Sequence, residues 1–294
     1  MNKSGATKGI LIGLWLGLAL ATSSARTEGG EEIPRSVNEA TLFGIGRYNL
    51  MDTYLSPGAE GRKYTGPGLR VINERMKMTR LADYRVSRQQ IINIDIASTR
   101  NASGTATDLA GFVDYTLGYH YHFPAIYPGL KLLAGGSAHA MAGFIYNTRN
   151  GNNPAAAKAD IDLNLSAMAI YTWRVKRYPI TLRYQFTLPF VGVMFSPHYG
   201  QSYYEIFDLG NASGIVRCGS FHNKFAQKHL ITADFPVGNS TIRVGYLHSS
   251  YRTDANAIRS HILSNTFLIG WVKEFVAFGG KRLKNKQAFK SAYY

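Results

Sequence analysis

Residues 106–123 read ATDLAGFVDYTLGYHYHF, and apolar and polar side chains alternate along nearly the whole stretch. A period of two puts successive side chains on opposite faces of a β-strand. One face would carry Leu109, Gly111, Val113, Tyr115, Leu117, Tyr119, Tyr121 and Phe123, and the other Asp108, Ala110, Phe112, Asp114, Thr116, Gly118, His120 and His122. The stretch is about twice as long as an ordinary strand of a soluble protein. It therefore predicts a long strand with one apolar face and one polar face.

The same alternation recurs along most of the chain. The other segments are 41–54, 69–78, 86–96, 130–146, 160–176, 180–188, 203–209, 215–221, 229–237, 241–249 and 260–278. Long polar connections alternate with short ones between them, as in barrels of the outer membrane. If residues 236–239 form a tight periplasmic turn, the number of strands is even. We therefore predict an all-β fold: an antiparallel transmembrane β-barrel of the outer-membrane type with about 12 strands, with about 10 or about 14 as alternatives.

A soluble β-sandwich also alternates and is the rival fold. The predicted strands are longer than those of a sandwich, and this favours the barrel. Aromatic residues gather near the predicted strand ends, at 119–123, 144–146 and 171–173, where the interface girdles of membrane barrels lie. The polar faces also carry charges in mid-strand, such as Asp114 and Arg183, which a barrel would pair inside its lumen.

The N-terminus has the features of a secretory signal peptide. Lys3 and Lys8 precede the apolar run of residues 9–21, and small residues after this run offer a cleavage site after Ala25. The run is shorter than the about 20 apolar residues of a membrane-spanning helix. The single cysteine, Cys218, allows no internal disulfide. We expect residues 1–25 to be the signal peptide, 26–40 an N-terminal periplasmic segment, 41–278 the barrel and 279–294 a basic C-terminal tail.

Three stretches carry a resemblance to a known family. They are residues 75–81 (RMKMTRL), 143–155 (GFIYNTRNGNNPA) and 192–207 (GVMFSPHYGQSYYEIF). They resemble the corresponding stretches of an uncharacterised family of exported outer-membrane barrels from Gram-negative bacteria, a domain-of-unknown-function family. The resemblance covers about residues 42–278 and implies an outer-membrane location, but it supplies no activity, ligand or catalytic residue. This sequence departs from the usual pattern in one respect. The last strand of an outer-membrane barrel normally ends the chain with an aromatic residue, which the barrel-assembly machinery recognises. Here the chain continues past Phe278 into the tail.

The chain is strongly basic, with 33 Lys and Arg against 18 Asp and Glu and a net charge of +15. Such a charge often indicates nucleic-acid binding, but export to the outer membrane excludes that partner. Outer-membrane lipid and lipopolysaccharide are the expected acidic neighbours. The tail carries Lys281, Arg282, Lys284, Lys286 and Lys290. It would lie on the inner leaflet or peptidoglycan side, or stay solvated with no fixed partner. The sequence does not predict an oligomeric state.

The charged residues of the polar faces predict a network inside the lumen. Its candidate members are Asp108, Asp114, Asp160, Asp162, Arg174 and Arg183. Two histidines at i and i+2, His120 and His122, have a spacing that a metal ion can use. No third ligand is fixed by spacing, so we interpret them as hydrogen-bonding histidines and expect no metal and no cofactor.

The segment 196–205 concentrates residues with catalytic chemistry. Ser196, His198, Ser202 and Glu205 are the types that a hydrolase uses, although the chain shows no nucleophile elbow. The alternative is a loop folded into the lumen as a plug, with Glu205 paired to a wall arginine such as Arg183. The sequence therefore favours a narrow or plugged pore, or a structural or interaction barrel. A lipid- or lipopolysaccharide-modifying enzyme and a surface-exposed ligand-binding barrel are the alternatives.

Overall fold

The computed structural model describes residues 35–56, 63–151, 153–176, 178–238, 240–276 and 290–294. The chain divides into two units, residues 1–33 and 34–294, and every described residue belongs to the second. The expected signal peptide lies outside the described residues, as does most of the expected tail. The first strand begins at Ser36, ahead of the expected start of the barrel at residue 41.

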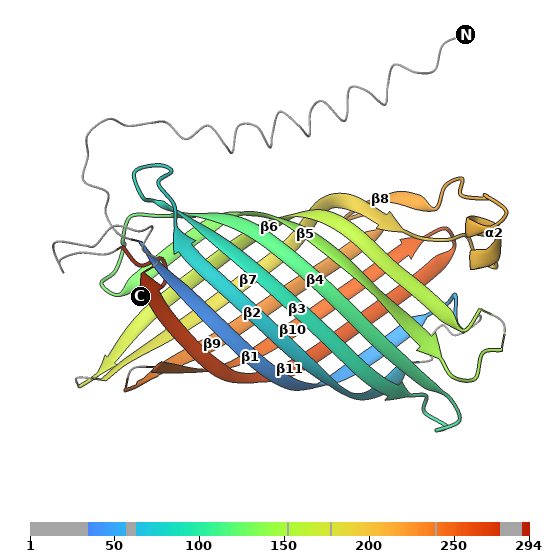
Figure 1. Ribbon diagram of the computed structural model, residues 1–294, viewed down its shortest axis with the longest axis horizontal. Helices are drawn as coiled ribbons and strands as arrows, with labels where there is room; N and C mark the ends of the chain where they lie inside the picture. Colours follow the sequence, from blue (N-terminus) through green and yellow to red (C-terminus); the bar gives the residue numbers. More distant parts are fainter. Residues whose placement is uncertain (1–34, 57–62, 152, 177, 239, 277–289) are drawn as a thin grey trace, which may run out of the picture. The chain divides into compact units, whose positions relative to one another are not determined.

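Long antiparallel strands make up nearly all of the second unit (Figure 1). They are β1 (Ser36–Asp52), β2 (Tyr64–Met78), β3 (Val86–Arg100), β4 (Thr107–His122), β5 (Leu130–Asn147), β6 (Ala155–Val175), β7 (Tyr178–Phe195), β8 (Val216–Ser220), β9 (Lys224–Val237), β10 (Ser240–Ala255) and β11 (Ile258–Val276), with one short helix, α2 (Tyr203–Phe207). Each strand pairs with the next along the chain, except that β7 pairs with both β8 and β9. Pairing of β1 with β11, from Ser36↔Val276 to Asp52↔Ser260, closes the ring. The result is a closed barrel of 10 strands.

The predicted alternation is confirmed, and its two faces are those of a membrane barrel. On β4, Val113 and Tyr115 point outward and are exposed, whereas Asp114 and His120 point inward and are buried. The pattern holds around the ring: Phe267 of β11 is 69% exposed on the outer surface. Apolar residues outside and charged residues inside reverse the arrangement of a soluble sandwich, and this excludes the rival fold. No helix among the described residues is long and apolar enough to cross a membrane.

The expected number of strands, about 12, is wrong, and the two extra segments show why. Residues 203–209 were expected to form a strand, but a capping box begins a helix there: Ser202 Oγ accepts from the Glu205 N–H and the Glu205 carboxylate accepts from the Ser202 N–H. The segment 215–221 does contain a strand, β8, but it is short and pairs only with residues 191–195 of β7. Neither segment forms a strand that extends from one end of the barrel to the other.

The two ends of the barrel differ in their connections. The turn end, where β1 begins and β11 ends, has short connections, and two of them are only two residues long, at 176–177 and 238–239. Gly238 has a positive φ of 59°, which suits glycine in such a tight turn. The loop end carries the two longest connections, residues 53–63 and the segment between β7 and β9 that contains α2 and β8, although residues 256–257 alone join β10 to β11 there. This asymmetry is typical of outer-membrane barrels.

Candidate functional site

Among the polar side chains of the inward faces, two groups concentrate buried charges. The turn-end network consists of Glu74, Arg183, Arg243 and Asp234, with Gln89 and Gln185 beside them. The loop-end cluster consists of His139, Asp114, Asp160, Asp162, Lys224 and Lys228. Each member stands at an inward position of its strand, because the period of two places alternate residues in the lumen.

The turn-end network is a fully buried set of carboxylates and guanidinium groups. Arg183 donates to Glu74 at 2.5 and 2.9 Å, and Arg243 donates to the same carboxylate at 2.9 Å. Arg243 also forms a two-pronged contact with Asp234, at 2.6 and 2.8 Å. Every carboxylate oxygen of Glu74 and Asp234 therefore has a charged partner. Bidentate pairs of this kind fix the geometry of both partners and are strong in a medium of low dielectric constant.

The end of the chain lies against this network. The ring of Tyr293 is fully buried beneath two guanidinium groups, with its centroid 4.4 Å from Arg243 Cζ and 5.2 Å from Arg183 Cζ. The Tyr294 hydroxyl donates to Asp234 at 2.6 Å, and Lys131 Nζ donates to the Tyr294 carboxyl end at 2.6 Å. Ala292 and Tyr293 also pack on an apolar layer made by Met76, Met78, Leu133, Met168 and Ile170. Residues 292–294 therefore lie in the lumen at the turn end. Lys290 is exposed and the other basic residues of the expected tail lie outside the described residues, so a place for the tail on a membrane surface stays a prediction.

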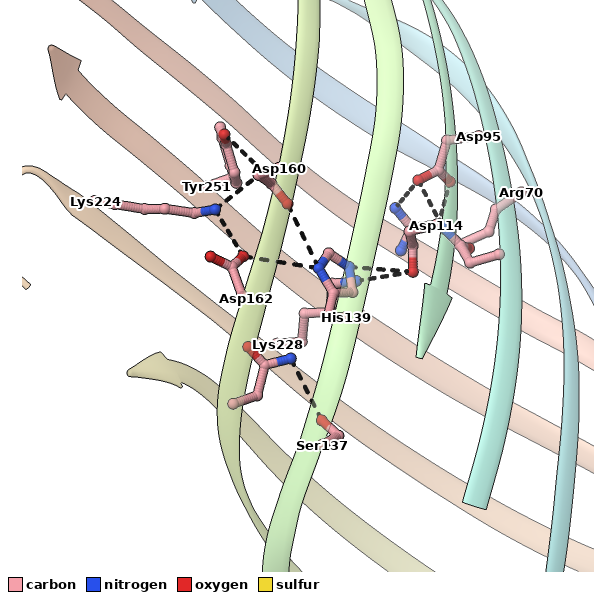
Figure 2. Close-up of polar contacts among 12 residues, drawn as sticks. Arg70, Asp95, Asp114, Ser137, His139, Asp160, Asp162, Lys224, Lys228 and Tyr251 are labelled. Atoms are coloured by element: carbon pink, nitrogen blue, oxygen red, sulfur yellow. Dashed lines mark hydrogen bonds and ion pairs between the residues drawn. The ribbon is translucent and has the colours of Figure 1, made fainter. Parts of the chain in front are cut away.

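The loop-end cluster surrounds one histidine with three acids (Figure 2). His139 Nδ1 lies 3.6 Å from Asp160 Oδ1 and 3.7 Å from Asp162 Oδ2, and Nε2 lies 3.5 Å from Asp114 Oδ1. Lys224 Nζ also contacts both β6 carboxylates. It lies 3.0 Å from Asp160 Oδ2 and 2.6 Å from Asp162 Oδ2.

Neighbouring groups hold the acids of this cluster in place. Tyr251 donates to Asp160 at 2.9 Å, and Asn93 donates to Asp114 at 2.7 Å. Asn93 links the cluster to Asp95, which pairs with the buried Arg70. A cavity of about 140 Å³ adjoins both polar groups, since its lining includes His139 and Asp162 from one and Glu74 and Gln89 from the other.

The structure divides the network predicted from the sequence. Asp114, Asp160 and Asp162 come together in the loop-end cluster, while Arg183 lies in the turn-end network. Asp108 lies nearer the loop end, where Asn147 donates to it at 2.7 Å. Arg174 stands at the far end of β6 and is exposed.

The residues considered for hydrolytic chemistry are not arranged as a catalytic relay. His198 Nε2 lies 3.1 Å from the Ser213 carbonyl oxygen, and Ser196 Oγ donates to the Ala255 carbonyl at 3.2 Å. Ser202 and Glu205 cap α2 together, and the hydrogen bonds from Ser202 lower the pKa of the Glu205 carboxyl. Glu205 therefore does not pair with Arg183, the wall arginine given as an example in the plug alternative. Tyr203 of this segment does pack on the barrel at the loop end, against Tyr54 and the buried cluster around it, while residues 292–294 enter the lumen at the turn end.

Several important side chains, Asp234 and Lys228 among them, escaped the sequence interpretation. Glu74, His139, Lys224 and Arg243 stand at inward positions, so the rule that selected Asp114 applies to them as well. His139 is hidden in a strand rich in Ala and Gly, where polar and apolar faces differ little. Tyr293 has no periodic signal, because it follows the last strand.

Comparisons with known proteins identify a family. The family model described as "Protein of unknown function (DUF3316)" matches residues 10–282. The transport unit of the autotransporter AIDA-I from Escherichia coli is 11% identical, with a TM-score of 0.42, covering 90% of this chain and 97% of the other. The β domain of the Bordetella autotransporter BrkA is 10% identical, with a TM-score of 0.39, covering 83% and 100% of the two chains. A search of the curated proteins found no match.

Proposed function

Since this chain belongs to the family of proteins of unknown function whose model spans residues 10–282, we propose that it is a plugged outer-membrane barrel. In this proposal residues 290–294 act as a stopper at the periplasmic end. The single observation that carries it is the seating of Tyr293 and Tyr294 on Arg183, Arg243, Asp234 and Lys131.

The outer-membrane location rests on the outward apolar face and the closed sheet. Every strand of a barrel finds its backbone partners within the ring, so the wall can pass through hydrocarbon. The end with short turns would face the periplasm. Outer-membrane lipid and lipopolysaccharide would then surround the wall, and the barrel-assembly machinery would insert it.

The lumen is blocked in two ways at the turn end. Arg183 and Arg243 cross the interior to reach Glu74, and both are fully buried. Tyr293 adds an aromatic ring beneath them, and its contact with both guanidinium groups is a cation–π contact. Ions would have to displace the ring and strip the guanidinium groups of their partners, so we expect very little conductance.

Planar-bilayer recording tests the stopper. The full-length mature chain should give no steady single-channel steps, whereas a variant lacking residues 290–294 should give brief openings, because it keeps the contacts of Arg183 and Arg243 with Glu74 and loses the aromatic ring beneath them. Tyr293→Ala should give an intermediate leak, because it removes the ring and keeps the rest of the chain end. Tyr204→Ala is the matched control, since this tyrosine of α2 is exposed and away from the network.

The migration of unboiled protein on gels must show a folded barrel for every variant. Steady single-channel steps from the full-length chain would overturn the proposal that the lumen is blocked. A folded but silent variant without residues 290–294 would overturn their role as the stopper.

A further inference from the structure

His139, Asp160 and Asp162 form a compact group in the lumen, apart from the residues that are proposed to block it at the turn end. Their possible ligand atoms, one from each residue, all lie within 4.8 Å of one another. Figure 2 shows the imidazole of His139 on β5 facing the carboxylates of the neighbouring β6. We propose that these three residues bind a divalent transition-metal ion, with zinc as the preferred ion.

The spacing of the atoms fits a tetrahedral ion. His139 Nδ1 is 3.6 Å from Asp160 Oδ1 and 3.7 Å from Asp162 Oδ2. Ligands at about 2.0–2.2 Å from zinc lie about 3.3–3.5 Å apart in tetrahedral geometry. The two distances from Nδ1 are therefore close to this spacing, and the ligand atoms of the three residues lie within 4.8 Å of one another, so small side-chain movements would bring them to three of the four positions.

Unpartnered atoms point to the same place. Asp160 and Asp162 are only 4% and 2% exposed, yet Oδ1 of each has no hydrogen-bond partner. Both ring nitrogens of His139 likewise have none. Buried polar atoms are normally hydrogen-bonded, because leaving them unpaired is unfavourable. A cation between the three residues would satisfy His139 Nδ1 and Asp160 Oδ1, which face each other at 3.6 Å. The Asp162 oxygen nearest to Nδ1 is Oδ2, which Lys224 also contacts, so Asp162 would share Oδ2 with Lys224 or turn its unpartnered Oδ1 toward the ion.

Asp114 has the position of a supporting residue. It lies 3.5 Å from His139 Nε2, on the opposite side of the ring from the proposed ion. Histidines that bind metals commonly direct their second nitrogen to a carboxylate, which orients the ring and raises its basicity. Asn93 holds Asp114 from behind at 2.7 Å.

The donor set selects the type of ion. One imidazole nitrogen with two carboxylates suits zinc and its neighbours in the first transition row. Calcium takes six to eight oxygen ligands, and magnesium keeps several waters in near-octahedral geometry. Neither ion finds such a set here, so both should bind more weakly than zinc.

Lys224 sets the limit on affinity. Its ammonium group contacts both β6 carboxylates, and Lys228 lies 3.3 Å from Asp114. Three carboxylates against two ammonium groups leave one negative charge when His139 is neutral. A divalent ion therefore binds against repulsion from Lys224, and removal of this lysine should strengthen binding.

The test measures zinc binding by the full mature chain in detergent. Zinc content after dialysis, chelator competition and the visible absorption of bound cobalt report the stoichiometry, affinity and geometry. The unaltered chain should retain a single zinc ion, and H139A and D162N should each weaken binding at least about 10-fold. H120A is the matched control, because His120 is also buried in the lumen but bonds Ser166; it should bind zinc like the unaltered chain.

The substitution K224M should change zinc affinity in the opposite direction from H139A and D162N. It should bind zinc at least about 10-fold more tightly, which an adventitious surface site would not do. Equal zinc binding by the unaltered chain and H139A, both folded on gels, would overturn the proposal, as would calcium or magnesium binding as tight as zinc. Zinc binding is measured without channel recordings, so its result tests the metal site independently of the proposed role of residues 290–294.

Discussion

The turn-end network and the loop-end cluster share one lumen and both pair carboxylates with basic side chains, but the carboxylate oxygens are satisfied to different degrees. In the turn-end network, guanidinium groups approach Glu74 and Asp234 in two-pronged fashion, and every carboxylate oxygen is paired. In the loop-end cluster, one oxygen of Asp160 and one of Asp162 have no hydrogen-bond partner. Planar arginine forks saturate a carboxylate, whereas lysine and histidine act as point contacts. The first group is therefore suited to closure and the second to binding a cation.

The largest expected effect is in the turn-end network. Arg243→Met leaves Asp234 without its guanidinium partner and removes one of the two guanidinium groups that donate to Glu74 Oε2. Breaking a buried pair in this way costs about 3–5 kcal/mol. The free energy of unfolding in urea, measured in lipid vesicles, should fall by that amount. Arg174→Met is the control: this arginine is exposed at the end of β6, so its loss should change stability by less than about 0.5 kcal/mol.

A smaller effect is expected in the loop-end cluster. His139→Gln, measured in the presence of a chelator, leaves Lys224 on the β6 carboxylates and Lys228 on Asp114. The loss in unfolding free energy should be about 1–2 kcal/mol, as for the removal of one partner from an otherwise supported buried group. A loss as large as that of Arg243→Met would show that both groups are equally saturated, and the contrast between them would fail.

The smallest effect belongs to a carboxylate outside the lumen. Hydrogen bonds from Ser202 lower the pKa of Glu205 below its ordinary value of 4.5. A lowered pKa in the folded state means that the cap stabilises α2 at neutral pH and is lost as pH falls through the lowered value. Amide exchange of residues 203–208, corrected for its intrinsic pH dependence, should rise in that range while the lumen strands stay protected. Glu205→Gln should remove the pH dependence.

Alternation predicted the barrel because it is a local property of each strand. In β4 nearly every residue obeyed it, and the inward acids Asp114 and Asp160 followed from the same rule. The number of strands did not follow, because Tyr203–Phe207 alternates over too few residues to outweigh the capping signal of Ser202 and Glu205.

The pairings inside the lumen are not local. Glu74 meets Arg183 and Arg243 across the barrel, over sequence separations of 109 and 169 residues, so register and barrel radius decide the partners. The position of Tyr293 depends on the finished lumen and leaves no pattern in the chain. Parity could have selected His139, but only the assembled wall shows that three acids surround it.

The contacts of residues 292–293 gather side chains from widely separated parts of the chain. Tyr293 contacts side chains from β7 and β10, and Ala292 and Tyr293 pack with residues of β2, β5 and β6. No single hairpin supplies this surface, because its five strands come from both halves of the sequence. Burial of Tyr293 therefore reports that the whole ring has formed, and the fluorescence of this region offers a reading of the assembled state.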